Sequence, residues 1–296
     1  MCAIPLMVTG RMRRLDHVAE LGFRVAAFSS AVATVGIFGF MAVLGYPLLT
    51  DGRLVEVLTS PWLPDQGAFG IFPMLAGTVL IASLAVLLAF PLSLGCASFV
   101  VVTGPRPLAG LLRKTVSVMT GVPTVIYGFV GVFLLVPVIR ETFHHGSGMC
   151  ILSAALCLAV LVSPTMILFF VDSFERVPLS QINAVDALGG TPVQKLLYVI
   201  LPQAWPGVIT GLVLGLGRAV GDTLIALMIA GNSVAIPHSM LDSARTLTAH
   251  IALIIAADFE SLEFRTLFAC GIVLYAFTAL TVLLVRTVGT ARKGAR

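Results

Sequence analysis

Long runs of apolar residues, separated by short polar stretches, extend over most of this chain of 296 residues. A helix needs about 20 mostly apolar residues to cross the hydrocarbon core of a bilayer. Runs of this length fall at 25–49, within 67–104, and at 116–138, 149–170, 205–229 and 267–285. The pattern predicts an all-α membrane protein with about six transmembrane helices. A shorter run at 247–257 cannot cross, and we expect it to form an interfacial or re-entrant helix in an external loop.

The composition agrees with a bilayer as the solvent for much of the chain. Only 11% of the residues are charged and 58% are apolar, and the mean hydropathy is +1.05. A soluble domain carries about 25% charged residues, so there are too few charges here to cover a water-facing surface. The five cysteines include no CxxC pair and are expected to be small buried hydrophobes.

The first apolar run, 25–49, follows a cluster of arginines, as the apolar region of a signal peptide does. It is longer than such a region, however, and no clear small-x-small cleavage site comes after it. We therefore expect a retained membrane anchor. This expectation divides the chain into an N-terminal segment at 1–24, a transmembrane domain at 25–289 and a tail at 290–296.

The basic residues predict the orientation of the spans. Six spans place both chain ends and the second and fourth connections on the same side of the membrane. The opposite side then holds only Arg53, Arg140, Arg245 and Arg265. The first side holds Arg11, Arg13, Arg14, Arg24, Arg106, Arg113, Lys114, Arg176, Lys195, Arg286, Arg292, Lys293 and Arg296. Since basic residues accumulate in cytoplasmic segments, the first side and both termini are predicted to be cytoplasmic. The net charge of +4 therefore reports topology, and no nucleic-acid partner is expected.

The fourth connection, 177–202, is long and is predicted to contain two short helices. The first begins after Pro178, with Ser180 as its N-cap, and ends at Gly189. One face of this helix carries small and apolar side chains at helical spacing, namely Ala184, Ala187 and Leu188. Such a face permits close approach to a partner surface.

The second helix of this connection is predicted to begin at Thr191, where Gln194 can complete a capping box. Pro202 and Pro206 are expected to break its continuation into the fifth span. Its apolar face comprises Val193, Leu196, Leu197 and Ile200. From the pattern alone, the two helices either dock onto a partner or lie on the inner membrane surface.

A motif within this connection resembles the EAA loop of ABC importer permeases, whose pattern is EAA, three residues, Gly, nine residues, Ile, one residue, Leu-Pro. The matching residues are Asn183, Ala184, Val185, Gly189, Val199, Leu201 and Pro202. The spacing agrees throughout, while Asn183 replaces the usual Glu, Val185 the second Ala and Val199 the Ile. In that family this loop is the coupling helix that docks onto a cytoplasmic ATPase. The resemblance implies this role for Asn183, Ala184, Val185, Ala187, Leu188 and Gly189.

The fifth span contains two ionisable residues, Arg218 and Asp222, inside an apolar segment. Ionisable groups within a membrane are costly and usually serve function. At four residues apart they are expected to share a helix face and to pair. The pair either provides a guanidinium for an oxyanion or only fixes helix packing.

Glycines also recur along the fifth span. Gly207, Gly211 and Gly215, with a second pair at Gly217 and Gly221, are typical of tight helix–helix packing in lipid.

The stretch 217–223, GRAVGDT, resembles the GRAIGET segment of phosphate-specific permeases, where the Arg and the acid are associated with the anion path. The resemblance carries this role to Arg218, Asp222 and Thr223, with Asp222 one methylene shorter than the usual Glu. The stretches at 69–78, 121–128 and 245–251 also resemble the PstC type of subunit. The Phe-Gly opening at 69–70 and the stretch at 245–251 favour this type over its paralogue, PstA.

The resemblance implies a type I ABC importer permease fold and a function as the subunit that forms the path for inorganic phosphate across the inner (plasma) membrane. The implied partners are a paralogous permease subunit, a cytoplasmic ATPase dimer that binds ATP and Mg²⁺, an external phosphate-binding protein and membrane lipid. No cofactor is expected on this chain. Another oxyanion such as molybdate, sulfate or phosphonate, and the PstA-type role, remain alternatives.

Signatures of catalysis are missing from the sequence. It contains no GxxxxGK[ST] loop, so ATP hydrolysis is assigned to a separate subunit. It also lacks HExxH and GxSxG, which argues against an intramembrane enzyme. His144 and His145, near Glu141, are expected to be a solvated face and not a metal site. A self-sufficient channel or secondary transporter would be favoured by inverted repeats and several paired intramembrane charges, and neither is evident.

Overall fold

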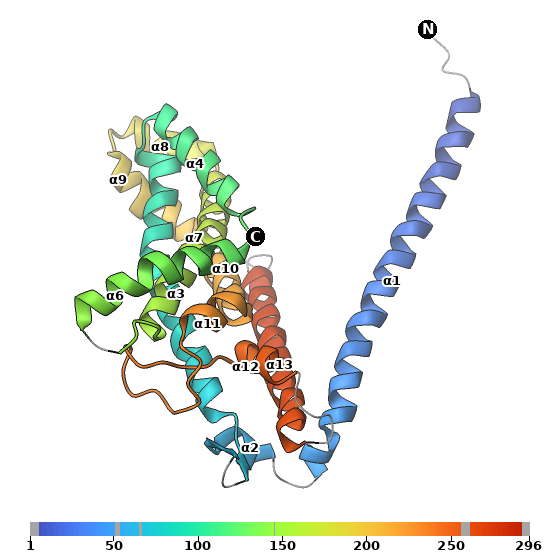
Figure 1. Cartoon of the computed structure of the whole chain (residues 1–296). Helices are drawn as coiled ribbons and strands as arrows, with labels where there is room; N and C mark the ends of the chain where they lie inside the picture. The colour runs from blue at the N-terminus through green and yellow to red at the C-terminus, as the bar shows by residue number, and fades with distance from the viewer. Residues whose placement is uncertain (1–5, 51–53, 65–66, 145, 256–260, 292–296) are drawn as a thin grey trace.

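The computed structural model describes residues 6–50, 54–64, 67–144, 146–255 and 261–291, most of them in helices. The helices are α1 (Leu6–Thr50), α2 (Leu54–Thr59), α3 (Phe72–Ser98), α4 (Arg106–Met119), α5 (Thr124–Val130), α6 (Val136–Phe143), α7 (Ile151–Glu175), α8 (Leu179–Ala187), α9 (Pro192–Lys195), α10 (Leu201–Gly221), α11 (Leu224–Ile229), α12 (Leu247–Ile254) and α13 (Leu262–Ala291). Two short strands, β1 (Trp62–Leu63) and β2 (Ala68–Phe69), pair antiparallel. Figure 1 shows how the helices are arranged.

Among the described residues, six helical stretches are long and apolar enough to cross a membrane, which confirms the predicted number. They are Asp16–Val43, Phe72–Thr103, Thr124–Phe143, Ile151–Glu175, Pro192–Gly221 and Thr266–Leu283. In its described part, 247–255, the short apolar run forms the helix α12, as expected for a segment that does not cross.

Several of the predicted spans are wrong at their ends. The first begins at Asp16 and not at 25, and the fourth continues to Glu175 and not to 170. The third begins at Thr124 and not at 116, because α4 ends at Met119 and Pro123 precedes the new helix. The fifth runs from Pro192 to Gly221 and not from 205 to 229.

The expected helix break at Pro202 is also wrong. A π-helical segment, Leu196–Ile200, joins α9 to α10, and its wider turn places Pro202 in the first turn of α10. There the missing proline N–H costs little, so the helix continues.

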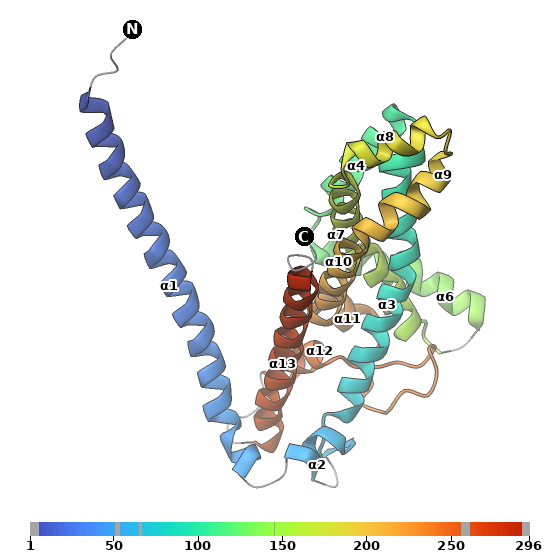
Figure 2. The ribbon, with the colours of Figure 1, turned by 180° about the vertical axis from the view of Figure 1, so that it is seen from behind.

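The centre of the bundle is α7, against which α3 and α10 pack (Figures 1 and 2). The glycines of α10 make this packing close. A Cβ added at Gly211 would approach Phe170 to 2.8 Å, and one added at Gly215 would approach the Met166 sulfur to 2.8 Å. Gly207 faces Ser173 in the same way. The prediction of tight glycine packing is therefore confirmed for this stripe.

Helix α1 stands apart from the bundle and approaches α13 only near its own C-terminal end (Figures 1 and 2). Phe38 stacks on Tyr275 with ring centroids 4.5 Å apart, and Phe40 meets Phe268 edge to face. None of the Asp16–Val43 window that determines this span is buried, against 72% for the span of α7. An apolar helix this exposed requires lipid or a partner around it.

The second and fourth connections lie at the same end of the bundle, where α4, α8 and α9 gather (Figures 1 and 2). Arg113 of α4 forms a two-pronged ion pair with Glu175 at the end of α7, at 2.5 and 3.1 Å. This confirms that the two connections share a side, while the identity of that side stays a prediction. Four of the basic residues from which the orientation was predicted lie outside the described residues, namely Arg53, Arg292, Lys293 and Arg296.

Candidate functional site

The two intramembrane ionisable residues lie at the C-terminal end of the fifth span, where the chain breaks between α10 and α11. Helix α10 ends at Gly221, and Asp222 follows in an extended conformation (φ −74°, ψ 125°). Thr223 then stands at the N-cap of α11, and its carbonyl accepts from the amide of Leu227. The expectation that Arg218 and Asp222 share one helix face and pair is therefore wrong, because Asp222 is the first residue beyond the helix.

Arg218 points to α7 instead of to Asp222. Its Nη1 donates a hydrogen bond to Thr165 Oγ1 at 2.6 Å. No carboxylate of the described residues lies within ion-pair distance of this guanidinium. A guanidinium has five N–H donors, so most of its capacity remains for an oxyanion or water.

Asp222 fixes the break through both its side chain and its backbone. Its Oδ2 accepts the Ile225 amide at 2.9 Å, which satisfies one of the free N–H groups at the start of α11. Its backbone carbonyl accepts the hydroxyl of Thr248, on α12, at 2.9 Å. The carboxylate thus serves as a helix cap at the break.

The face of α10 beside Arg218 is open. Cβ atoms added at Gly217 and Gly221 would meet none of the described atoms within 4 Å. Because the described part of the chain packs no helix against this second glycine pair, the tight packing expected of it stays a prediction. The guanidinium, the carboxylate and the two glycines therefore border a surface that the described part of the chain does not cover.

Thr165 and Thr248 are two site residues that sequence reasoning missed. Thr165 lies in an apolar stretch of α7, directly after Pro164, and Thr248 lies in the short helix α12. A single threonine in an apolar run is ordinary, and only the packing of distant segments places these hydroxyls on Arg218 and Asp222.

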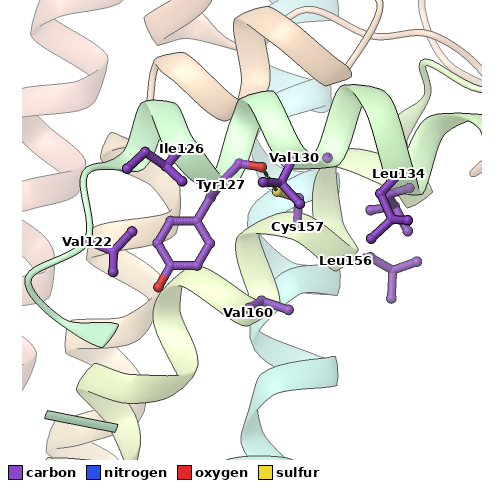
Figure 3. Close-up of a pocket in the computed structure, with 10 residues that line it drawn as sticks. Val122, Ile126, Tyr127, Val130, Leu134, Leu156, Cys157 and Val160 are labelled. Atoms are coloured by element: carbon purple, nitrogen blue, oxygen red, sulfur yellow. Dashed lines mark hydrogen bonds between the residues drawn. The ribbon is translucent and has the colours of Figure 1, made fainter. Parts of the chain in front are cut away.

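An apolar cavity of about 530 Å³ lies elsewhere, between α5 and α7 (Figure 3). Its lining includes no ionised side chain. The Tyr127 hydroxyl is bonded to the Met119 carbonyl, and the Cys157 thiol to the carbonyl of Tyr127. Desolvating an anion there without a compensating charge is costly, so this cavity is no oxyanion site. Its lining comprises Val122, Ile126, Tyr127, Val130, Gly131, Leu134, Leu135, Leu156, Cys157 and Val160.

The predicted coupling residues lie on and just after α8, at the end of the bundle opposite α2 (Figures 1 and 2). Asn183, Ala184, Ala187, Leu188 and Gly189 are exposed, while Val185 is half-buried. Leu188 is 88% exposed, the highest exposure among the large apolar side chains described. Gly189 has φ +73°, a conformation that favours glycine and ends the helix.

The two helices of this connection are held mainly by their own side chains. Thr191 and Gln194 form the predicted capping box, at 2.9 and 3.3 Å. Lys195 of α9 pairs with Asp186 of α8 at 2.6 Å. The predicted N-cap at Ser180 is wrong, because α8 begins at Leu179 with Pro178 preceding it, and proline fixes the entry into the helix.

No group of three metal-ligating side chains occurs among the described residues. His144 is exposed at the end of α6. His145 lies outside the described residues.

Comparisons with known proteins agree on one family. The sequence model of the binding-protein-dependent transport system inner membrane component matches residues 89–292. The probable ABC transporter permease protein YqgH of Bacillus subtilis is 32% identical over 97% of this chain and 96% of that protein. The phosphate transport system permease protein PstC of Xylella fastidiosa (strain Temecula1) is 32% identical over 93% of this chain and 91% of that protein.

A solved structure has the same fold. An inward-facing conformation of the MetNI methionine ABC transporter superposes with a TM-score of 0.55 at 18% identity, over 74% of this chain and 97% of that one. At this identity the likeness concerns the fold, which is that of a type I ABC importer permease.

Proposed function

Because the chain belongs to the family of binding-protein-dependent transport system inner membrane components, we propose that it forms the translocation path for inorganic phosphate in an ATP-driven importer. The observation that carries the proposal is the Arg218 guanidinium, which lies on an open face beside a helix break within the bundle. The PstC proteins among its relatives support phosphate as the substrate.

The path requires components that this chain lacks. A paralogous permease subunit would complete the pore, and its natural place is the open face beside Gly217 and Gly221. Two copies of a cytoplasmic ATPase would bind ATP and Mg²⁺, and an external binding protein would deliver phosphate. The chain would lie in the inner membrane with both termini cytoplasmic.

Arg218 suits an anion that must be bound and then released. Its bond to the neutral Thr165 hydroxyl holds the guanidinium in place without neutralising it. When ionised, the Asp222 carboxylate at the helix break would moderate the attraction for a phosphate dianion. Conduction needs binding strong enough to admit the ion and weak enough to let it leave.

The coupling helix α8 would transmit the work of the ATPase. Exposed apolar side chains such as Leu188 are unfavourable in water and favour burial in a groove of a partner. Closure of the ATPase dimer would pull α8 and rock the attached spans, so that the path opens alternately to the two sides.

The decisive experiment measures radiolabelled phosphate uptake in a strain that lacks this chain, complemented with the parent or with Arg218→Gln. We expect the variant to assemble at parent levels and to reduce uptake to background. Arg176→Gln is the matched control, because it removes an exposed arginine, paired with Asp172, at the cytoplasmic end of α7. Full uptake by Arg218→Gln would refute the role of the guanidinium.

Competition distinguishes the substrate. We expect excess phosphate, but not molybdate, sulfate or phosphonate, to suppress the labelled uptake. Suppression by one of those anions at lower concentration would assign the path to that anion and leave the importer role intact.

A further inference from the structure

Three buried threonines connect the helix break to two other parts of the bundle. They are Thr78 of α3 and Thr246 and Thr248 of α12, which we call the threonine cluster; each is at most 9% exposed. Polar groups buried this deeply are expensive unless every hydrogen bond is made. The hydrogen-bond partners of the three hydroxyls therefore show which segments the cluster connects.

The hydroxyl protons of α12 can be assigned one by one. Thr248 donates to the carbonyl of Asp222 at 2.9 Å, which uses its only proton. The contact of 3.0 Å between the Thr246 and Thr248 hydroxyls must then be a donation from Thr246. Thr246 in turn accepts the Ala249 amide at 3.2 Å. A directed chain of hydrogen bonds thus runs from the first turn of α12 to the backbone of the break.

Thr78 anchors the same turn of α12 to the second span. Its hydroxyl donates to the Met74 carbonyl at 2.7 Å and accepts the Leu247 amide at 2.9 Å. The packing is close here, because a Cβ added at neighbouring Gly77 would lie 2.5 Å from the Arg245 carbonyl oxygen. The first turn of α12 is therefore bonded to α3 through Leu247 and to the break through Thr248.

Asp222 needs such a partner. Its backbone is extended, so its carbonyl has left the hydrogen-bond pattern of α10, and Thr248 is the partner that the structure provides. With the carboxylate bound to the Ile225 amide, both polar ends of the residue are fixed. We propose that Thr248, oriented by Thr246, is a positioning residue that sets the geometry of the break and thereby the rate at which the anion passes Arg218. This inference rests on the proposed function, since it concerns the same path.

The test compares Thr248→Val, which keeps the shape and removes the hydroxyl, with Thr248→Ser, which restores it. In the assembled transporter, we expect Thr248→Val to lower the maximal uptake rate about tenfold, with the half-saturating phosphate concentration changed less than twofold. Thr248→Ser should return the rate to within about twofold of the parent. Thr34→Val is the matched control, because Thr34 is an exposed threonine of α1 bonded only to its own helix at Ser30.

A second measurement does not depend on phosphate. A cysteine introduced at Gly221, where an added side chain meets open space, reports the break by its rate of reaction with a soluble maleimide. We expect Thr248→Val to change this rate about tenfold and Thr248→Ser to leave it unchanged. The chain without the introduced cysteine serves as the blank.

The outcomes separate the two proposals. If Arg218→Gln transports normally, the proposed function fails, and the maleimide reaction still tests the cluster. If Thr248→Val matches the parent in both uptake and labelling, the positioning role is overturned. Should Thr248→Val not assemble, Thr246→Val removes the orienting bond together with the acceptor of the Ala249 amide, and we expect a loss of about threefold that Thr246→Ser restores.

Discussion

The helix break at Asp222 and the coupling pair α8–α9 are held together in opposite ways. The break is fixed by side chains from distant segments. Thr165 accepts a hydrogen bond from Arg218, and Thr248 donates one to the carbonyl of Asp222. The pair α8–α9 packs Ile182 on the bundle, but its polar contacts are largely local, in the capping box and in the ion pair between Lys195 and Asp186, and it leaves apolar side chains such as Leu188 exposed. This difference agrees with the proposed roles, in which the break keeps a fixed geometry for the anion and the exposed face of α8 docks onto a partner.

The largest effect among these predictions is expected from a substitution at the exposed C-terminal end of α8. Leu188→Asp places a charge where a docked partner would need an apolar side chain, so uptake should fall at least about tenfold and ATP hydrolysis should no longer respond to the binding protein. The measurement is uptake and hydrolysis by the complete transporter in vesicles.

Leu179→Asp is the control for this substitution, because Leu179 is 73% exposed at the start of α8 but lies outside the predicted coupling residues. Equal losses from both variants would contradict a specific role for Leu188.

The second prediction concerns the pH dependence of stability at α12, the helix that holds the break through Thr248. Burial, and secondly the charge of Arg245, lower the pKa of His250 on α12 to about 4 from 6.5. Below pH 6.5 His250 binds a proton in the unfolded chain, whereas in the folded chain it binds one only near pH 4. Stability that is fully present above pH 6.5 should therefore be lost as the pH falls through this window, by on the order of 3 kcal/mol.

The measurement is the unfolding midpoint in lipid nanodiscs between pH 7.5 and pH 4.5. His250→Gln should flatten the dependence, whereas His238→Gln, at an exposed position, should preserve it. An unchanged slope in His250→Gln would exclude this histidine as the cause.

The smallest expected effect lies in the capping box. Thr191→Ala removes the oxygen that accepts the Gln194 amide, which costs about 1 kcal/mol of local stability at the start of α9. Hydrogen exchange at the first amides of α9 should accelerate about fivefold, while exchange at Ile225 stays the same. Faster exchange at both places would show that the two regions do not open independently.

Much of the fold was predictable from the sequence, because the bilayer imposes a length and a polarity on each span. The number of spans, the shared side of α4 and α8, and the capping box at Thr191 follow from local patterns. The Gly207 stripe is also a local signal, since a helix without side chains on one face must pack closely.

The candidate site was predictable only in part. A four-residue spacing predicted that Arg218 and Asp222 pair, because the pattern contains no sign that the helix ends at Gly221. Thr165 and Thr248 reach these residues across 53 and 26 positions of the chain, and no local pattern encodes such contacts. The role of each site residue in transport stays a prediction.

The unbroken fifth span has a mechanical consequence. From Pro192 to Gly221 the chain is one helical rod of 30 residues, roughly 45 Å long at 1.5 Å per residue. Its N-terminal end begins directly at the capped turn beside α8, and Arg218 lies near its C-terminal end. Because the helix does not break at Pro202, a tilt at the α8 end would move Arg218 sideways. In the proposed function, this movement of a single helix would couple ATP hydrolysis by the partner to passage of the anion.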